Sequence, residues 1–315
     1  MTAGDDRGSS SLGASAPLGG EEPPMNDREW LTERFQEHRR HLSAVAYRML
    51  GSVTEAEDAV QEAWLRIRDQ DPRAVENIRA WLTTVVGRVC LNMLRSRRAR
   101  REEFSDVHVP DPVVTLRGTV GPEQEALLAD SVGLALLVVL DALAPAERLA
   151  FVLHDVFGVP FSEIATVLDR SEAAAQQLAS RARRRVQDSP TPDRDLNRQR
   201  RLVDAFFDAA RDGDFDALLH ILHPEVELRI DGGKLRRQAS LLIHGAKAVA
   251  AHTRTYSSLY PHVVPALVNG TAGAIIAPDS RPFAVMGFTI SGERITAIHV
   301  LVDPERLNQL DLRIP

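Results

Sequence analysis

The stretch of sequence that decides the fold is residues 161–186, which read FSEIATVLDRSEAAAQQLASRARRRV. Apolar residues at helical spacing predict a short helix over 161–168 and a longer one over 172–186. The segment between them, Asp169-Arg170-Ser171, is predicted to form a tight turn. Ser171 suits the N-cap of the second helix because its hydroxyl can accept a hydrogen bond from a free backbone amide. The pattern predicts a helix-turn-helix.

The second of these helices carries side chains suited to reading DNA. Gln and Arg can bind base edges through two hydrogen bonds, and further arginines suit phosphate groups. The residues expected to face DNA are Gln176, Gln177, Ser180, Arg181 and Arg184. A three-helix core with a basic end would give the same pattern, and the usual turn glycine is absent, so the stretch alone leaves both interpretations open.

Upstream, residues 27–101 predict another helical domain. Thr54 and Glu57 fit a capping box at the start of one helix, whose apolar stripe continues to Ile67. A second helix, predicted over 78–97, runs into five arginines within 95–101. Its polar face consists of Thr84, Arg88, Asn92 and Arg95. Short hydrogen-bonding side chains that lead into arginines suit a helix laid along a phosphate backbone.

Length and composition exclude several classes of protein. A chain of 315 residues is expected to form two or three domains. Hydrophobic residues at 44% and charged residues at 26% exclude a wholly disordered or collagen-like chain. The one cysteine, Cys90, excludes a disulfide framework and a cysteine-built zinc site, and we expect it in the core. The net charge of −6 opposes DNA binding on average, but two arginine clusters, five within 95–101 and four within 181–185, lie at the helices above.

Breaks in the helical pattern divide the chain. Residues 1–26 have neither the apolar core nor the cationic start of a signal peptide, so we expect a disordered tail, with translation starting at Met1 or Met25. The longest apolar stretch is too short to span a bilayer, which predicts a cytoplasmic protein without membrane contact. Prolines and glycines predict linkers over 103–124 and 188–196. The expected domains are two all-α units over 27–102 and 125–187 and a third domain over 197–315.

The third domain begins with helices and continues with strands. Helices are predicted over 196–222 with a break at Gly213, a strand over 226–230, and further short strands over 266–269, 272–277, 283–290 and 294–302. This order predicts an α+β fold with a curved antiparallel sheet. Its histidines and aspartates show no spacing that forces a catalytic pair, so we expect no enzyme, cofactor or metal. An enzyme or small-molecule sensor that is recruited to DNA by its helical half remains the alternative.

Three stretches, in this order, resemble the extracytoplasmic-function (ECF) sigma factors of bacterial RNA polymerase. They are AEDAVQEAWLR at 56–66, RAWLTTVV at 79–86, and the helix-turn-helix at 161–183. In that family a four-helix region 2 domain is joined by a flexible linker to a region 4 helix-turn-helix domain. The resemblance implies a sigma factor that binds core RNA polymerase through its clamp helices and flap and directs promoter-specific initiation.

The resemblance also implies roles for individual residues. The positions that dock on the polymerase clamp helices are Asp58, Gln61 and Glu62. The base-capture loop at 73–78, which contains Asn77, resembles together with Trp81 the segment that captures a flipped promoter base, although Trp81 could equally be a core residue. The positions along the minus-ten element are Arg88, Asn92 and Arg95. Those at the minus-thirty-five element are Gln176, Gln177, Ser180 and Arg181.

The third domain is similar to the SnoaL-like members of the NTF2-like superfamily, whose cone-shaped fold encloses a pocket. A sigma factor fused to such a domain resembles the ECF41, or SigJ-like, group. Two motifs carry this resemblance: Asp231-Gly232-Gly233-Lys234, and Asp303-Pro304-Glu305-Arg306-Leu307. We expect both motifs to lie at a regulatory interface with the helical domains, so that the third domain controls activity in cis. The pocket could hold an unknown small ligand.

Overall fold

The computed structural model describes residues 27–70, 75, 77–101, 107–116, 133–188, 193, 195–310, 312 and 314. The predicted tail, residues 1–26, lies outside this range, as do the start of the base-capture loop at 73–74 and the first residues of the second predicted domain at 125–132. Of the helices in the described parts, none combines the length and the apolar character needed to cross a membrane.

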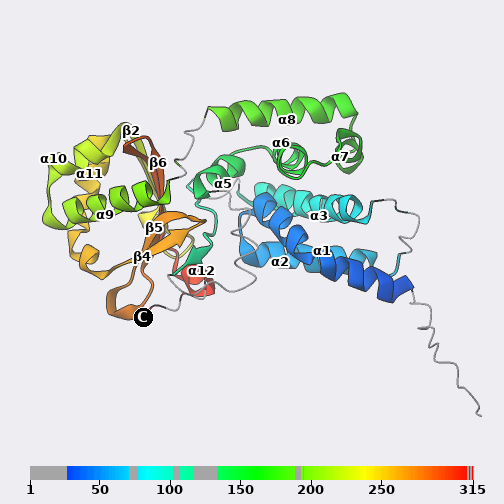
Figure 1. Cartoon of the computed structure of the whole chain (residues 1–315), viewed down its shortest axis with the longest axis horizontal. Helices are drawn as coiled ribbons and strands as arrows, with labels where there is room; N and C mark the ends of the chain where they lie inside the picture. The colour runs from blue at the N-terminus through cyan, green and yellow to red at the C-terminus, as the bar shows by residue number, and fades with distance from the viewer. Residues whose placement is uncertain are drawn as a thin grey trace, which may run out of the picture.

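In the described residues, the first domain consists of three long helices (Figure 1): α1 (Asp27–Leu50), α2 (Val53–Ile67) and α3 (Ile78–Arg101). Their apolar faces are buried against one another, and Cys90 lies in this core as a free thiol. Helix α2 begins after Ser52, whose hydroxyl accepts a hydrogen bond from the Glu55 amide at 3.4 Å. The predicted capping box at Thr54 is therefore wrong: the preceding turn at Gly51, with φ of 72°, starts the helix earlier.

The second domain contains the predicted helix-turn-helix. Its described elements are α5 (Leu134–Asp141), α6 (Pro145–Phe151), the π-helical turn η1 (Val152–Val156), α7 (Phe161–Leu168) and α8 (Glu172–Gln187). Helix α6 continues directly into η1. The turn before α8 is as predicted: the Ser171 hydroxyl accepts a hydrogen bond from the Ala174 amide at 3.3 Å. Asp169, with φ of 55°, takes the left-handed position that a glycine usually fills.

The third domain is a seven-stranded sheet covered by helices. Its helices are α9 (Leu196–Asp212), α10 (Phe215–Ile221), α11 (Ala246–Thr255) and α12 (Pro304–Gln309), with 3-10 turns η2 (Arg237–Ala239), η3 (Ser257–His262) and η4 (Pro278–Ser280). Its own strands are β2 (Leu222–Asp231), β3 (Leu241–His244), β4 (Val263–Val268), β5 (Thr271–Ile276), β6 (Ala284–Ser291) and β7 (Arg294–Leu301). The break between α9 and α10 is at Gly213, as predicted. The α+β fold class is confirmed, whereas β3 and α11 were not predicted.

The strand order is β1-β4-β5-β6-β7-β2-β3. All neighbouring pairs are antiparallel except β2 with β7, which is parallel. No tight turn joins β2 to β7, because most of the domain lies between them in sequence, so no hairpin forces them to be antiparallel.

The first strand of the sheet comes from the predicted linker. β1 (Val114–Thr115) pairs with β4, with Val114 opposite Val268 and Thr115 opposite Leu267. The strand at residues 114–115 lies within the predicted linker over 103–124 and was not itself predicted. A two-residue strand has too few residues to show alternation, so only its tertiary partner reveals it.

The two faces of the sheet have different neighbours (Figure 1). Helices α9, α10 and α11 pack with one face into a self-contained core that includes Phe206, Leu218 and Val249. Residues of the other face, such as Val268 and Val285, share one apolar cluster with both helical domains. A Cβ atom on Gly287 of β6 would lie 2.8 Å from the Leu134 side chain, so α5 packs directly on the sheet. The two helical domains and the sheet therefore share a core.

Candidate functional site

The predicted DNA-reading face of α8 is open to solvent. Gln176, Gln177, Arg181 and Arg184 are exposed and Ser180 is half-buried, while Ala175, Ala179 and Ala182 on the opposite side are buried. The other two arginines of the cluster serve the domain itself: Arg183 pairs with Asp155, and Arg185 lies 3.0 Å from Glu147. Arg181 and Arg184, which the helix-turn-helix prediction places toward DNA, are therefore exposed on this face.

The polar face of α3 lies partly against the second domain. Asn92 and Arg95 are exposed, but the Arg88 guanidinium donates a hydrogen bond to the Thr166 carbonyl of α7 at 3.1 Å. Half-buried Trp81 lines a groove of about 650 Å³ between the two domains. Exposed Asn77 accepts a hydrogen bond from the Ala80 amide at 3.1 Å and so caps α3. The predicted minus-ten face is therefore partly covered in this arrangement.

A buried arginine joins the two helical domains. Arg148 of α6 is 1% exposed, and its guanidinium donates hydrogen bonds to the Arg48 carbonyl at the end of α1 at 3.1 and 3.2 Å. It also lies 3.2 Å from Asp141. Because a buried cation without partners is costly, these bonds fix the relative position of the domains. Sequence reasoning missed Arg148, whose one signal is a charge inside an apolar helical run.

The acidic face of α2 remains available to a partner. Asp58 and Gln61 are exposed, and Glu62 lies 2.5 Å from Arg66 one turn further along the helix. Leu65, on the same side of α2, is 51% exposed. Sequence reasoning overlooked this leucine. Its signal in the sequence is an apolar side chain at a position outside the buried apolar stripe of the helix.

The two motifs of the third domain meet the linker at an ionic cluster, which we call the linker latch: His108, Val109, Asp111, Asp231 and Arg306. The Asp231 carboxylate accepts hydrogen bonds from the Val109 amide at 2.9 Å and from Arg306 at 2.7 Å, and it lies 3.1 Å from His108. Arg306 also lies 2.5 Å from the Asp111 carboxylate and donates to the Val109 carbonyl. Burial opposes ionisation of Asp231, but the bond with His108 and the charge of Arg306 hold its pKa well below the usual range.

The remaining motif residues shape the latch. Gly233 has φ of 62°, and a Cβ atom there would lie 1.8 Å from the Asp303 carboxylate, so only glycine fits. Gly232 likewise approaches the Arg236 backbone. Asp303 accepts a hydrogen bond from the Glu305 amide at 3.0 Å, which caps α12 with Pro304 in its first turn and orients Arg306. Leu307 is buried in the shared core, whereas Lys234 and Glu305 are exposed.

A second junction joins the first domain, the linker and the third domain. The Asn269 side chain donates a hydrogen bond to the Tyr47 hydroxyl of α1 at 2.9 Å and accepts one from the Val113 amide at 3.1 Å. Tyr47 in turn donates to the Asp111 carbonyl at 2.8 Å. Sequence reasoning missed this junction, because its one local signal is the Asn269-Gly270 turn. The described part of the linker is therefore held by the latch, by Asn269 and by the pairing of β1 with β4.

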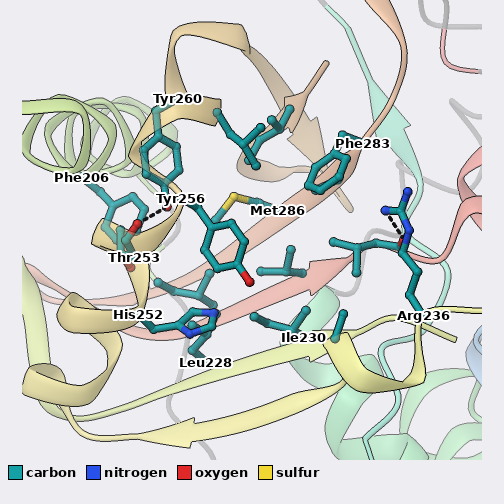
Figure 2. Close-up of a pocket in the computed structure, with 17 residues that line it drawn as sticks. Phe206, Leu228, Ile230, Arg236, His252, Thr253, Tyr256, Tyr260, Phe283 and Met286 are labelled. Atoms are coloured by element: carbon teal, nitrogen blue, oxygen red, sulfur yellow. Dashed lines mark hydrogen bonds between the residues drawn. The ribbon is translucent and has the colours of Figure 1, made fainter. Parts of the chain in front are cut away.

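Inside the third domain, the sheet and helices enclose a cavity of about 220 Å³ (Figure 2), lined mainly by apolar side chains and by His252, Tyr256 and Arg236. His299 lies outside it. The described residues hold no group of three His, Cys, Asp or Glu side chains placed to bind a metal ion.

Comparison with known proteins identifies relatives of the chain. Residues 34–100 match the family model Sigma-70 region 2, and residues 133–186 match Sigma-70, region 4. The ECF RNA polymerase sigma factor SigJ of Mycobacterium tuberculosis is 41% identical over 276 residues, which cover 84% of this chain and 86% of SigJ. The probable ECF RNA polymerase sigma factor SigI of the same species is 35% identical and covers 91% of this chain and 98% of its own length. The crystal structure of SigJ covers 90% of this chain and 100% of its own, with a TM-score of 0.72 and 35% identity.

Proposed function

Because this chain belongs to the ECF RNA polymerase sigma factors, we propose that its C-terminal domain regulates in cis the transcription initiation that its two sigma domains direct. As a sigma factor the chain binds core RNA polymerase and promoter DNA. The observation that carries the proposal is the linker latch with strand β1, through which the C-terminal domain holds the chain between the two sigma domains.

The geometry of a promoter supports an inhibitory role for this arrangement. The minus-ten and minus-thirty-five elements are named for their positions, which differ by about 25 base pairs. This separation corresponds to roughly 85 Å of duplex. Helices α3 and α7 are in contact through Arg88 and Thr166, and α8, with 16 residues, extends for roughly 24 Å. The two DNA-reading faces must therefore separate before both elements can be bound at once.

The linker has the length for that separation only when it is free. Between Arg101 and Leu134 lie roughly 30 residues, which can reach about 100 Å when fully extended. With residues 107–116 bound to the sheet by β1, the latch and Asn269, much of this reach is lost. We therefore infer that release of the linker from the C-terminal domain is the activating step.

The assignments of individual contacts form part of the same proposal. Asp58, Gln61, Glu62 and the neighbouring Leu65 would contact the polymerase clamp helices, with the second domain on the flap. Asn77 and the α3 residues Trp81, Arg88, Asn92 and Arg95 would lie at the minus-ten element, and the exposed face of α8 at the minus-thirty-five element. We propose that the C-terminal domain is a regulator rather than an enzyme and that the chain acts in the cytoplasm, where polymerase and promoter are found.

A reversible disulfide tests the proposal. Val114 and Val268 are directly opposite in an antiparallel pair, where Cα atoms are about 4.5–5.5 Å apart, a separation that a disulfide can bridge. The variant V114C/V268C would lock the linker to the sheet when oxidised. Native Cys90 is 0% exposed, and burial raises the pKa of its thiol to about 12, so it should not interfere.

The assay is transcription by purified core polymerase on a promoter library. The oxidised variant should initiate poorly and regain activity when a reductant is added, while the wild-type chain responds to neither treatment. Equal initiation by the oxidised and reduced variant would refute linker release as the activating step.

A further inference from the structure

The cavity of the C-terminal domain has the features of a binding site (Figure 2). Phe206, Tyr260, Phe283 and Met286 form much of its wall, together with aliphatic side chains of β2, β6 and β7. Its volume of about 220 Å³ exceeds that of the roughly 150 Å³ engineered cavity that binds benzene and is below the range of about 300–1,000 Å³ for drug-sized ligands. A ligand about the size of one six-membered ring with a small substituent fits it.

The charges around the cavity favour a neutral ligand. None of the lining residues is acidic, so a cation would have no partner there. Arg236 is already engaged, because it donates a hydrogen bond to the Val302 carbonyl at 3.2 Å and its guanidinium lies over the Phe283 ring.

One polar atom of the wall needs a hydrogen-bond partner. Among the described residues, the buried Nε2 atom of His252 has no hydrogen-bond partner. Burial lowers the pKa of His252, so its ring is neutral at pH 7. A buried polar atom without a partner is costly, and a ligand hydroxyl would satisfy it. Tyr256, whose ring lies 5.1 Å from that of His252, adds a second polar group on the same side of the cavity.

The cavity wall is continuous with the linker latch. Ile230 and Val302 line the cavity, and the next residues in the chain are Asp231 of the latch and Asp303 of the α12 cap. The Val302 amide donates a hydrogen bond to the Asp231 carbonyl at 2.8 Å. The Arg236 amide also donates to the Gly232 carbonyl at 3.1 Å, so the rim of the cavity is hydrogen-bonded to the glycine motif.

We propose that this cavity binds a small neutral ring compound with one hydroxyl group, a simple phenol or cyclic alcohol, and that its occupancy stabilises the latched linker. The second half rests on the proposed function above. The cavity is formed in the latched state, and a ligand shifts an equilibrium toward the state that it binds better. The bound ligand would therefore keep the sigma factor inactive, and its loss would favour linker release.

Binding is tested on the full chain with 4-fluorophenol as the probe and fluorine NMR as the readout. Fluorobenzene, which lacks the hydroxyl, should bind roughly fivefold more weakly, the ratio expected for one hydrogen bond. 4-Fluorobenzoate should bind more weakly still, because the cavity offers no free cation. Tighter binding of the benzoate, or no saturable binding of the phenol, would overturn the ligand assignment.

Two variants locate the site. A284F fills the cavity and should abolish binding, and H252L should make the phenol bind no better than fluorobenzene while leaving fluorobenzene unaffected. H220L is the matched control, since His220 is exposed on α10, and should bind as the wild type does. Circular dichroism checks that each variant is folded. If A284F is not folded, the binding result for H252L alone tests the location of the site. Wild-type binding by H252L would refute the role of His252.

The coupling to the latch is read by hydrogen exchange of residues 107–116. Saturating 4-fluorophenol should slow their exchange at least threefold in the wild type, and H252L should need roughly fivefold more of the phenol to reach the same effect. Binding without this effect would refute the coupling but leave the disulfide test of linker release untouched, because that test uses no ligand. Failure of the disulfide test with slowed exchange would instead contradict the proposed function alone.

Discussion

The most informative single substitution is Arg306→Gln in the linker latch. The Arg306 guanidinium bridges the carboxylates of Asp111 and Asp231 and the Val109 carbonyl, and its side chain is 17% exposed. Hydrogen bonds to charged groups contribute about 1.5–3 kcal/mol each, and glutamine can replace at most one of them without its charge. Asp231, with 4% of its side chain exposed, would then keep a buried charge without its main counterion.

We expect the substitution to weaken linker docking by about 2–3 kcal/mol. This corresponds to a rise of roughly 30- to 150-fold in the fraction of released linker. Hydrogen exchange of residues 107–116 should become faster by a similar factor, and core-dependent initiation should increase. Arg254→Gln, at an exposed position of α11, is the matched control and should change neither.

Two results would contradict this reasoning. If exchange of residues 107–116 is unchanged in Arg306→Gln, the latch does not hold the linker. If exchange accelerates but initiation does not, the linker is released without activating the protein. A point substitution is preferable to removal of the C-terminal domain, because truncation would also expose the apolar surface that Leu134 and Val113 share with the sheet.

Three further predictions follow from particular residues. Gly233→Ala should weaken linker docking by roughly 1–3 kcal/mol in the same exchange assay, because the new Cβ would overlap Asp303. Gly292 has a similar φ of 61° with open space around it, so Gly292→Ala controls for backbone strain and should leave the latch unchanged. Gln177→Ala should cost the holoenzyme about 1–3 kcal/mol of promoter discrimination in a binding selection, whereas Gln187→Ala at the end of α8 should cost none. Burial lowers the pKa of His299 to about 3 in the folded chain, against about 6.5 when unfolded, so its contribution to stability is complete above pH 6.5 and is lost as the pH falls toward 3. The free energy of unfolding should therefore drop by about 2 kcal/mol between pH 6.5 and 5, and urea titrations should show a smaller drop for His299→Leu.

The sequence was sufficient where a feature depends on neighbouring residues. Ser171 caps α8 and Gly213 ends α9 in the left-handed conformation because both effects are local. The apolar periodicity of the helices and the alternation of the longer strands predicted the fold class for the same reason.

Features that depend on distant residues could not be predicted in this way. β1 exists only because β4, about 150 residues later, provides its partner, and Arg148 is satisfied only by a carbonyl at the end of α1. The motif residues around Asp231 and Arg306 were expected at an interface, but their bond to the linker and the Tyr47–Asn269 junction require the assembled chain. The cavity likewise results from packing of several elements and leaves no pattern along the sequence.

In the proposed function, the two sigma domains are held together in the free chain and separate on a promoter. Energy transfer between dyes at Ser96 of α3 and Gln187 of α8, both exposed, measures their separation after each is replaced by cysteine. A dye pair at Gln36 and Ser96, within the first domain, is the control and should not change. We predict efficient transfer in the free chain and a large loss in the polymerase–promoter complex, toward the roughly 85 Å between the two promoter elements. Undiminished transfer in a complex that initiates transcription would contradict the account.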